Sequence, residues 1–465
     1  MVPDRLAPLL DETRAIAERF ERAGKKLYLV GGAVRDAILG RERGEWDFTT
    51  DARPDETEAI VKDWADAVWL QGKRFGTIGS RKDGRIYEIT THRAEVYRPD
   101  SRKPDVRFAE AIEADLARRD FTINAMAITL PGLQLIDPFD GLTDLAAQRL
   151  RTPLTPEESF EDDPLRMLRA ARFIAGYQLK PVPALTAAVG AMRARLEIVS
   201  AERIRAELDK LLVVEQPGPG LWFLVDTGLA EEFLPELPAL GLEQDPIHRH
   251  KDVLAHTIAV VERTPHRDRI LRLAALLHDI GKPKTRSIGV NGVTFHHHEV
   301  VGARMARERM QALRYSNDDV ADVTRLVELH LRFHGYHEGD GGWTDSAVRR
   351  YARDAGPLLD RLNVLTRADC TTRNKLKAQL LAERMDLLEA RIEELREREE
   401  LAAVRPELDG RQVMAHLGIA PGPSVGRALA FLLELRLEEG PLGEEEAYRR
   451  LDEWSAAQGE AAETA

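Results

Sequence analysis

The pattern of apolar residues changes at about Asp163, and this change restricts what the chain can fold into. Before it, residues 26–30 (KLYLV) predict a buried strand that runs into a Gly-Gly turn, and helical spacing resumes at residues 34–39. Further strands are predicted at residues 46–50, 75–80, 85–90 and 123–130. After Asp163 the spacing is helical, for example at residues 201–214. The predicted fold class is therefore α+β, with a mixed β-sheet first and helices after it.

Turns rich in Pro and Gly divide the helical part. The segments QPGPG (216–220) and PELPALGLEQDP (235–246) predict hinges. Beyond them, eleven of the 13 histidines lie between His248 and His337. An apolar seam at 4-3-4-3 spacing from Leu381 to Leu395 then predicts a packed helix that ends before Pro406. These features predict four segments, at residues 1–150, 151–245, 246–375 and 376–465.

Composition limits the partners and the compartment. The 465 residues carry a net charge of −12, which argues against a polycation that coats nucleic acid, so any phosphate partner must meet local positive patches. The single cysteine, Cys370, cannot form an internal disulfide and is typical of a reducing cytoplasm. We find neither an N-terminal apolar leader nor an apolar run of about 18 residues, so we expect a cytoplasmic protein with no membrane partner. The oligomeric state stays open.

Two carboxylates follow the glycine turn. The turn runs into Arg35 and Asp36, and the segment EWD then places Glu45 and Asp47 on a predicted strand. Alternate residues of a strand face the same side, so both carboxylates would point to one place. Such a pair can bind Mg²⁺, which prefers oxygen ligands and substrate phosphates. The pattern predicts two-metal nucleotidyl transfer, with a solvated acidic turn as the alternative.

A second charged cluster precedes the last predicted strand of the sheet. It consists of Arg118, Arg119 and Asp120, followed by Asn124. The planar guanidinium donates bidentately and therefore suits the oxygens of a triphosphate.

Seven motifs in order carry a resemblance to a known family. They are GGAVRDAILG, EWDFTTDA, YEITTHR, DLARRDFTINAMA, DPFDGLTDL, DDPLRMLRAARF and ERIRAEL, between residues 31 and 208. The series resembles the class II tRNA nucleotidyltransferases and bacterial poly(A) polymerases of the polymerase β superfamily. The resemblance implies a polymerase β-like head with a mixed β-sheet, followed by an all-α neck, body and tail.

The resemblance also implies roles for individual residues. Glu45 and Asp47 would hold Mg²⁺, with Glu88 as a third carboxylate, although the family usually has Asp where this chain has Glu45. Arg119 would touch the triphosphate, and Asp120 with Asn124 the ribose. The full set of implied nucleotide-binding residues is Gly31, Gly32, Arg35, Asp36, Arg119, Asp120, Asn124, Asp163, Arg166 and Arg169.

The choice of base is expected to depend on one side-chain pair. The segment DDPLR at 162–166 resembles the family's EDxxR motif, and helical spacing would put Asp163 and Arg166 on one face. Cytosine and adenine each offer a ring-nitrogen acceptor beside an amino donor, which fits one donating Arg and one accepting Asp. Guanine and uracil present a protonated ring nitrogen beside a carbonyl, which leaves polar groups mismatched at about 1 to 3 kcal/mol each. The alternative is a helix whose arginines only pair with acids.

The histidine-rich block resembles the HD phosphohydrolase superfamily through LAALLHDIGK at residues 273–282, which contains His278 and Asp279. By motif, their partners would be His256, His298, His330 and Asp369. Imidazole together with carboxylate suits Mn²⁺, Ni²⁺ or another transition metal, and a shared Asp allows one or two ions.

These resemblances lead to one expected function and to stated rivals. We expect template-independent addition of CCA to the 3′ end of tRNA from CTP and ATP, with release of pyrophosphate. The rivals are an A-adding enzyme or poly(A) polymerase of the same family, and a metal-dependent HD phosphohydrolase acting on cyclic or 2′-phosphate RNA ends. A protein that only binds RNA would need no catalytic carboxylates.

Overall fold

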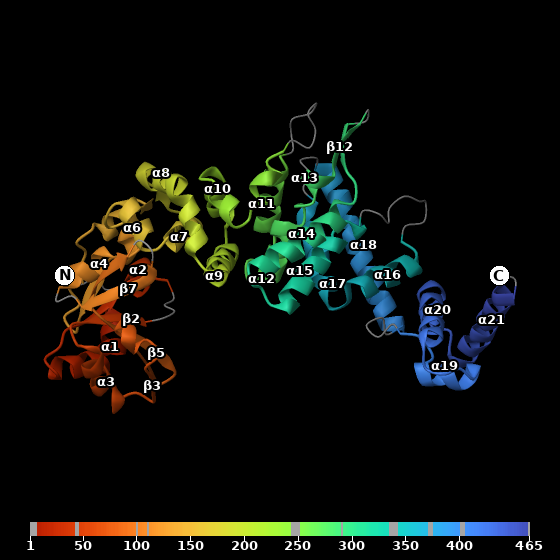
Figure 1. The fold of residues 1–465 in the computed structure, drawn as a ribbon, viewed down its shortest axis with the longest axis horizontal. Helices are drawn as coiled ribbons and strands as arrows, with labels where there is room; N and C mark the ends of the chain where they lie inside the picture. Colours follow the sequence, from red (N-terminus) through yellow and green to blue (C-terminus); the bar gives the residue numbers. More distant parts are fainter. Residues whose placement is uncertain are drawn as a thin grey trace. The chain divides into compact units, whose positions relative to one another are not determined.

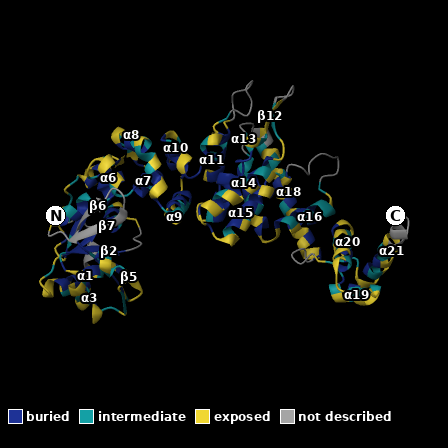
Figure 2. Ribbon diagram, viewed as in Figure 1, coloured by how far each residue is buried: buried dark blue, intermediate teal, exposed yellow. Residues whose placement is uncertain are grey.

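The computed structural model describes residues 7–41, 46–98, 101–108, 111–242, 252–289, 292–333, 343–370, 375–399 and 405–463. The chain forms two compact units, Met1–Pro238 and Ala239–Ala465 (Figure 1). Within each unit the buried residues, dark blue in Figure 2, follow the strands and the inner faces of the helices. The division into four segments remains a prediction.

The first unit begins with a seven-stranded mixed sheet. The strand order is β3-β4-β5-β2-β1-β8-β9, in which β2 pairs with β5 in parallel and the other pairs are antiparallel. The strands are β1 (Leu27–Val30), β2 (Trp46–Thr50), β3 (Ala67–Trp69), β4 (Thr77–Lys82), β5 (Arg85–Thr91), β8 (Ala127–Leu130) and β9 (Leu135–Ile136). A separate hairpin pairs β6 (Arg93–Arg98) with β7 (Ser101–Phe108). The expected mixed sheet is confirmed.

Short helices flank this sheet. They are α1 (Ala7–Arg22), α2 (Gly32–Leu39), α3 (Pro54–Lys62), α4 (Ile112–Ala117) and α5 (Gly141–Ala146). The helix α2 starts directly after β1, because Gly31 turns the chain with a φ of +71°, a conformation that residues with a side chain rarely adopt. The sheet register sets the end of β1 beside the start of β2, since Leu29 pairs with Phe48.

Helices complete the first unit. They are α6 (Pro156–Asp162), α7 (Leu165–Tyr177), α8 (Pro183–Met192), α9 (Ala201–Leu212) and α10 (Gly218–Asp226), and a short parallel pair joins β10 (Arg149–Leu150) to β11 (Lys180–Pro181). The QPGPG segment is not the predicted hinge, because Gly218 opens α10; Pro and Gly are tolerated in a first helical turn, where backbone N–H groups have no helical partner. Gly220 brings α10 against α7, since a Cβ there would lie 2.5 Å from the Ala171 carbonyl oxygen.

The second unit is helical apart from one described hairpin, β12 (Arg286–Gly289) with β13 (Gly292–Phe295). Its helices are α11 (Val253–Arg263), α12 (Arg269–Leu277), α13 (Lys282–Thr285), α14 (His298–Ala312), α15 (Asn317–Leu329), α16 (Asp345–Ala355), α17 (Leu359–Asp369), α18 (Lys375–Glu399), α19 (Gly410–Leu417), α20 (Pro423–Glu439) and α21 (Glu444–Glu463). The predicted seam of α18 is buried at Met385, Leu388, Ile392 and Leu395.

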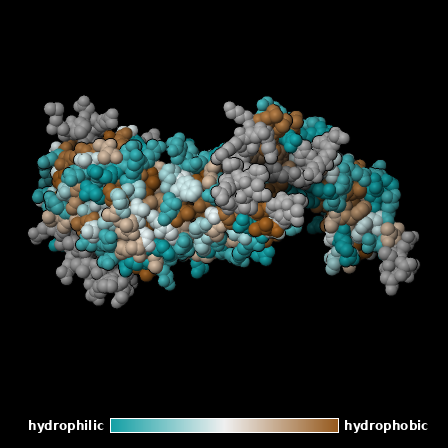
Figure 3. Space-filling view, turned by 90° about the horizontal axis from the view of Figure 1, so that it is seen from above, coloured by the Kyte–Doolittle hydropathy of each residue, from teal (hydrophilic) through white to brown (hydrophobic). Residues whose placement is uncertain are grey.

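A buried ion pair joins three helices of this unit. Arg349 of α16 donates to both oxygens of Glu399 in α18, at 2.8 and 3.0 Å, and to the Leu437 carbonyl of α20. Hydrophilic residues cover much of the face of the molecule that is seen in Figure 3, with apolar patches between them. Among the described helices, none combines the length and apolar character that crossing a membrane requires.

Candidate functional site

Two predicted carboxylates lie on neighbouring strands. Asp47 of β2 and Glu88 of β5 are register partners in the parallel ladder, so their side chains stand on the same face of the sheet. The opposite face at this point is apolar, with Trp46, Phe48 and Tyr87 buried in the core. Glu45 lies outside the described residues, and its place beside Asp47 remains a prediction.

Arg119 lies across the glycine turn, on which Asp47 also borders. A Cβ on Gly31 would lie 2.7 Å from Arg119 Nη1 and 3.9 Å from Asp47 Oδ2. The turn therefore needs glycine both for its φ angle and for this close approach. Asp115, which is fully buried, pairs with Nη2 of Arg119 at 3.3 Å and with Nη2 of Arg118 at 3.2 Å. Asp115 was not among the predicted site residues, although its spacing of three and four residues from the two arginines indicates the pairing.

Arg35 of α2 is held from three sides. Its Nε and Nη2 donate to the two carboxylate oxygens of Asp36 at 2.9 Å, and its Nη1 donates to Asn124 Oδ1 at 2.5 Å. Its guanidinium also lies over the Tyr177 ring, 4.1 Å from the centroid, and the Tyr177 hydroxyl donates to Asp36. Gly32 packs beside Arg35: a Cβ added at Gly32 would lie 3.4 Å from Arg35 Nη2. Asp36 thus orients Arg35. Direct contact of either residue with a nucleotide remains a prediction.

Asp120 uses both of its oxygens within the protein. Oδ1 accepts from Asn124 Nδ2 at 2.9 Å and from the Phe121 backbone, and Oδ2 accepts from Nε and Nη2 of Arg169 at 2.9 and 2.5 Å. Burial opposes ionisation, but Arg169 and Asn124 hold the pKa of the Asp120 carboxyl well below its usual range. The predicted ribose contact would therefore require Asp120 to share one of these hydrogen bonds.

A buried glutamate continues this network. Glu207 of α9, 4% exposed, accepts from Arg172 Nε at 2.7 Å and lies 3.5 Å from Arg169 Nη1. Glu207 lies in the motif ERIRAEL but was not predicted to have a role in the site. Its position on the buried face of an amphipathic helix was the signal.

The predicted base-reading pair is arranged differently from the expectation. Asp163 is not on the helical face of Arg166, because it precedes Pro164 and adopts an extended backbone, with φ −145° and ψ 101°. Asp163 Oδ1 accepts from the Leu165 backbone at 3.1 Å, and Oδ2 accepts from Nη2 of Arg203 at 2.7 Å. Arg166 is 8% exposed and is the second residue of α7, which begins at Leu165. Their roles in reading a base remain predictions.

The histidine block forms one cluster in the second unit. Asp279 is at its centre: its Oδ2 lies 3.3 Å from His278 Nε2 and 3.7 Å from His256 Nε2, and its Oδ1 lies 3.4 Å from His298 Nε2 and 4.0 Å from His330 Nε2. Asp369, at the end of α17, is 2.9 Å from His256 Nε2 and 3.6 Å from His278 Nε2. All six predicted residues therefore meet, although they come from five helices or helix ends.

Three imidazoles in this cluster are oriented in the same way. In each, Nδ1 contacts the backbone carbonyl three residues earlier: His278 to Ala275 at 2.8 Å, His298 to Phe295 at 2.8 Å and His330 to Val327 at 2.6 Å. A proton on Nδ1 leaves the Nε2 lone pair toward Asp279, and this is how metal-binding histidines are oriented. The three Nε2 atoms are buried without a hydrogen-bond partner among the described residues. Two overlapping groups, His256-His278-Asp279 and Asp279-His298-His330, have the spacing of metal ligands.

Charge within the cluster also fits a cation. Lys282 Nζ donates to Asp279 Oδ2 at 2.6 Å. Burial lowers the pKa of His278, but Asp279 and Asp369 outweigh burial and raise it to about 10. Burial and the charge of His278 lower the pKa of His330 to about 3. Asp279 and Asp369 thus draw positive charge into the cluster, and Lys282 supplies part of it at Asp279.

Close backbone packing places His298 beside the His278-Asp279 turn. A Cβ on Gly281 would lie 2.2 Å from the His298 carbonyl oxygen and 2.7 Å from the Gly302 nitrogen. Glycine at position 281 therefore lets the first turn of α14 approach Asp279.

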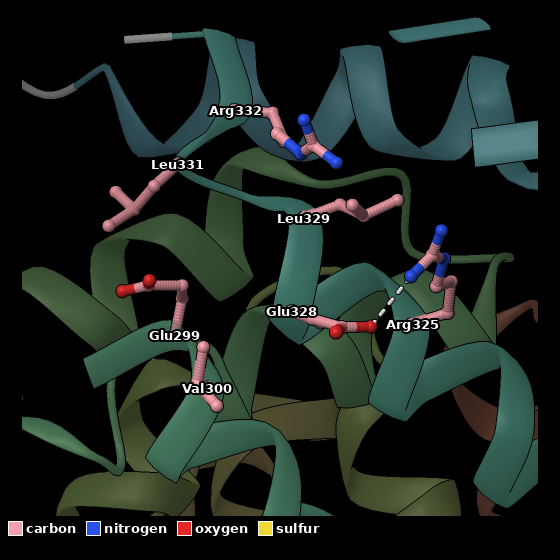
Figure 4. A pocket seen from close by; sticks show the side chains of 7 residues that line it. All are labelled: Glu299, Val300, Arg325, Glu328, Leu329, Leu331 and Arg332. Carbon is pink, nitrogen blue, oxygen red and sulfur yellow. Dashed lines mark hydrogen bonds and ion pairs between the residues drawn. The ribbon is translucent and has the colours of Figure 1, made fainter. Parts of the chain in front are cut away.

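A shallow pocket lies between α14 and α15, two helices whose ends also carry residues of the histidine cluster. Its volume is about 480 Å³, and Figure 4 shows the side chains that line it: Glu299, Val300, Arg325, Glu328, Leu329, Leu331 and Arg332. Arg325 donates to Glu328 at 2.7 Å and, through Nε and Nη2, to the Asp354 carbonyl, while Arg332 pairs with the Asp354 carboxylate. Since these arginines are already paired, we assign the pocket no ligand.

Three protein families match parts of the chain. Residues 27–151 match the Poly A polymerase head domain, residues 179–240 a probable RNA- and SrmB-binding site of polymerase A, and residues 252–374 the HD domain.

Curated relatives extend these matches. An A-adding tRNA nucleotidyltransferase of Deinococcus radiodurans is 34% identical over 427 residues, which cover 88% of this chain and 91% of the relative. A CCA-adding enzyme of Levilactobacillus brevis is 40% identical over 227 residues, which cover 49% of this chain and 56% of the relative.

Solved structures share the fold. The crystal structure of the Bacillus stearothermophilus CCA-adding enzyme in complex with CTP has a TM-score of 0.67 at 22% identity and covers 99% of this chain and 100% of its own. A Thermotoga maritima CCA-adding enzyme complexed with tRNA has a TM-score of 0.57 at 19% identity, with coverage of 96% and 95%.

Proposed function

The chain belongs to the tRNA nucleotidyltransferase family, and from this premise we propose that it adds C, C and A to the 3′ end of tRNA from CTP and ATP, without a template and with release of pyrophosphate. The matched RNA-binding segment and the tRNA-related names of the relatives support tRNA as the partner. The single Cys370 and the tRNA substrate support a cytoplasmic location.

The observation that carries this proposal is a set of polar contacts in the first unit, at the glycine turn and in a network that leads from α2 to α7. Arg119 lies over Gly31 beside Asp47, and the links Arg35-Asn124-Asp120-Arg169 lead from α2 to α7, the helix of Arg166. A nucleotide has a triphosphate at one end and a base at the other, and this network joins residues suited to each.

The family implies dependence on a divalent metal, and we infer Mg²⁺ at Asp47, Glu88 and Glu45. Bound there, it would supply charge stabilisation to the reacting phosphate and the leaving pyrophosphate. The chain's own residues would bind and orient: Arg119 and Arg35 meet phosphate oxygens, and Asn124 with Asp120 lies beside the ribose. Arginine suits this work because its fork of donors matches phosphate geometry.

The choice of base is assigned to Arg166 and Asp163. Arg166 would donate to the ring nitrogen of C or A, and Asp163 would accept from the amino group. The same two groups would face a proton and a carbonyl on U or G, and both contacts would be lost.

A defined set of tRNA transcripts separates CCA addition from its rivals. Transcripts that end before CCA, after C and after CC are incubated with CTP or ATP alone or together. A CCA-adding enzyme extends the first transcript with CTP and completes all three when both nucleotides are present. Extension of only the CC transcript by one A would make this an A-adding enzyme, and long A tails on any end would make it a poly(A) polymerase.

A second function is favoured by the buried cluster around Asp279. We propose that this site hydrolyses a 2′,3′-cyclic phosphate or a 2′-phosphate at an RNA end. Water adds to phosphorus and one P–O ester bond breaks, which gives a ring-opened monoester in the first case and inorganic phosphate in the second. His256, His278, Asp279, His298, His330 and Asp369 would hold Mn²⁺, Ni²⁺ or a similar ion, which supplies Lewis acidity toward the phosphate.

A double variant tests this second activity. His278→Ala with Asp279→Ala should abolish hydrolysis of RNA carrying a 2′,3′-cyclic phosphate in the presence of Mn²⁺ or Ni²⁺, while CCA addition persists. If the wild-type protein, correctly folded, hydrolyses neither substrate across a panel of metals, the cluster has no such activity.

A further inference from the structure

The guanidinium of Arg166 is fixed by groups that the base-reading proposal does not use. Its Nη1 donates to Ser159 Oγ at 2.9 Å and to the Ser159 carbonyl at 3.3 Å, and its Nη2 donates to the Arg118 carbonyl at 2.5 Å. These contacts use three of the five N–H bonds of an arginine, so the side chain keeps donors for a base while its plane is held.

The helix that carries Ser159 has a capped start. Ser159 is 4% exposed and lies on α6, whose start is closed by a capping box between Thr155 and Glu158. The Ser159 carbonyl also accepts from the Asp163 backbone nitrogen at 3.2 Å. One residue therefore contacts both members of the proposed reading pair.

We propose that Ser159 is a positioning residue for base selection: its hydroxyl holds the Arg166 guanidinium in the orientation that accepts C and A and rejects U and G. This inference rests on the proposed function of Arg166. Discrimination requires that a mismatched base cannot recover its lost hydrogen bond by rotating the arginine. With the hydroxyl removed, Nη1 keeps only the longer bond to the carbonyl, so the guanidinium can turn toward the carbonyl oxygen of U or G.

Ser159→Ala tests this role by steady-state kinetics on tRNA that lacks CCA. The ratio of kcat/KM for CTP to that for UTP should fall about tenfold, the effect of one hydrogen bond to a charged group. Incorporation of UTP should rise while kcat with CTP changes little. The ratio for ATP against GTP, measured on tRNA ending in CC, should fall in parallel, because one side chain reads both bases.

Three further variants make the result decisive. Ser159→Thr and Ser159→Val have nearly the same shape, so only the first should preserve discrimination, even if Ser159→Ala destabilises α6. Thr155→Ala removes the cap of the same helix without touching Arg166, and should lower stability with no change in the CTP to UTP ratio. Equal ratios for the Thr and Val variants at position 159 would overturn the inference.

Arg166→Ala separates this inference from its premise. If it leaves the CTP to UTP ratio unchanged, Arg166 is not the reader and the proposed site is wrong. If it lowers the ratio while Ser159→Ala and Ser159→Val do not, Arg166 reads the base and Ser159 has no part in it.

Discussion

Buried carboxylates orient the arginines of the nucleotide site. Asp115 is shared by Arg118 and Arg119, and Glu207 is shared by Arg169 and Arg172. Inside a protein each partner would otherwise be an unpaired charge, so the pair fixes the guanidinium in place. Arginines held in this way need less ordering when a nucleotide binds.

The first prediction at this scale concerns Asp47. Asp47→Asn removes a charge from the proposed metal ligand, so nucleotide addition should fall by several orders of magnitude. Binding of tRNA, measured by filter retention, should change little because the carboxylate contacts no part of the tRNA body in this account. Near-normal turnover would remove Asp47 from the catalytic residues.

The second prediction concerns Glu207. Glu207→Gln leaves the half-buried Arg172 without its charge partner and should lower the free energy of unfolding of the first unit by about 2 to 3 kcal/mol. Glu231→Gln is a matched control, because Glu231 pairs with Arg193 on the surface, at 3.4 Å and 55% exposed, and should cost less than about 1 kcal/mol. If urea unfolding shows similar losses in the free energy of unfolding for the two variants, the buried pair stabilises the protein no more than the surface pair does.

At the scale of elements, the sequence predicted some strands close to their observed bounds and placed the start of others too early, where a 3₁₀ turn precedes the strand. β1 and β2 lie where they were expected. The strand expected from residue 123 instead starts at Ala127, because residues Thr122–Asn124 form a 3₁₀ turn in which Asn124 binds Asp120. Likewise β4 starts at Thr77, after a 3₁₀ turn at Lys73–Phe75.

The sequence predicted which residues would form the proposed nucleotide site, but not which of them contact one another. The motifs identified Arg169 and Asp120, but their hydrogen bonds join residues 49 positions apart, which no local spacing reveals. The pairing of Asp163 with Arg166 on one helical face failed for a local reason, since the residue before a proline avoids the helical conformation. The six residues of the HD cluster each lie in a recognisable motif, and the structure brings them together, while their role as metal ligands remains a prediction.

The prediction at this scale concerns how closely α14 approaches the His278-Asp279 turn. Gly281→Ala should push His298 away from Asp279, because the new Cβ would meet backbone atoms at 2.2 and 2.7 Å. Metal retained after dialysis in Ni²⁺ should fall, together with hydrolysis of cyclic phosphate. Gly302→Ala is the control, since its nearest neighbour is 3.3 Å away and the backbone need move little. Equal metal retention in the two variants would contradict the packing argument.

At the scale of the whole molecule, the two proposed sites lie in different compact units. The proposed nucleotide site belongs to Met1–Pro238 and the HD cluster to Ala239–Ala465. Their donor sets also differ, with carboxylate oxygens in the first and imidazoles with shared carboxylates in the second, so they should prefer different metals.

This separation predicts independent loss of the two activities. Asp47→Asn should abolish nucleotide addition and leave hydrolysis of a 2′,3′-cyclic phosphate unchanged in Mn²⁺ or Ni²⁺. The reverse pattern is expected for the double variant of His278 and Asp279. Parallel loss of both activities in either protein, at unchanged thermal unfolding, would show that the two sites are coupled.

The most direct measurement is the sequence that the wild-type protein adds to tRNA when all four nucleoside triphosphates are present. Transcripts that end before CCA are incubated with Mg²⁺ and equal concentrations of ATP, CTP, GTP and UTP, and the new 3′ ends are sequenced. If protein side chains read the bases as proposed, we expect the ends to be CCA, with U and G rare at every position. Ends that carry A alone, long runs of A, or mixtures of all four bases would contradict it.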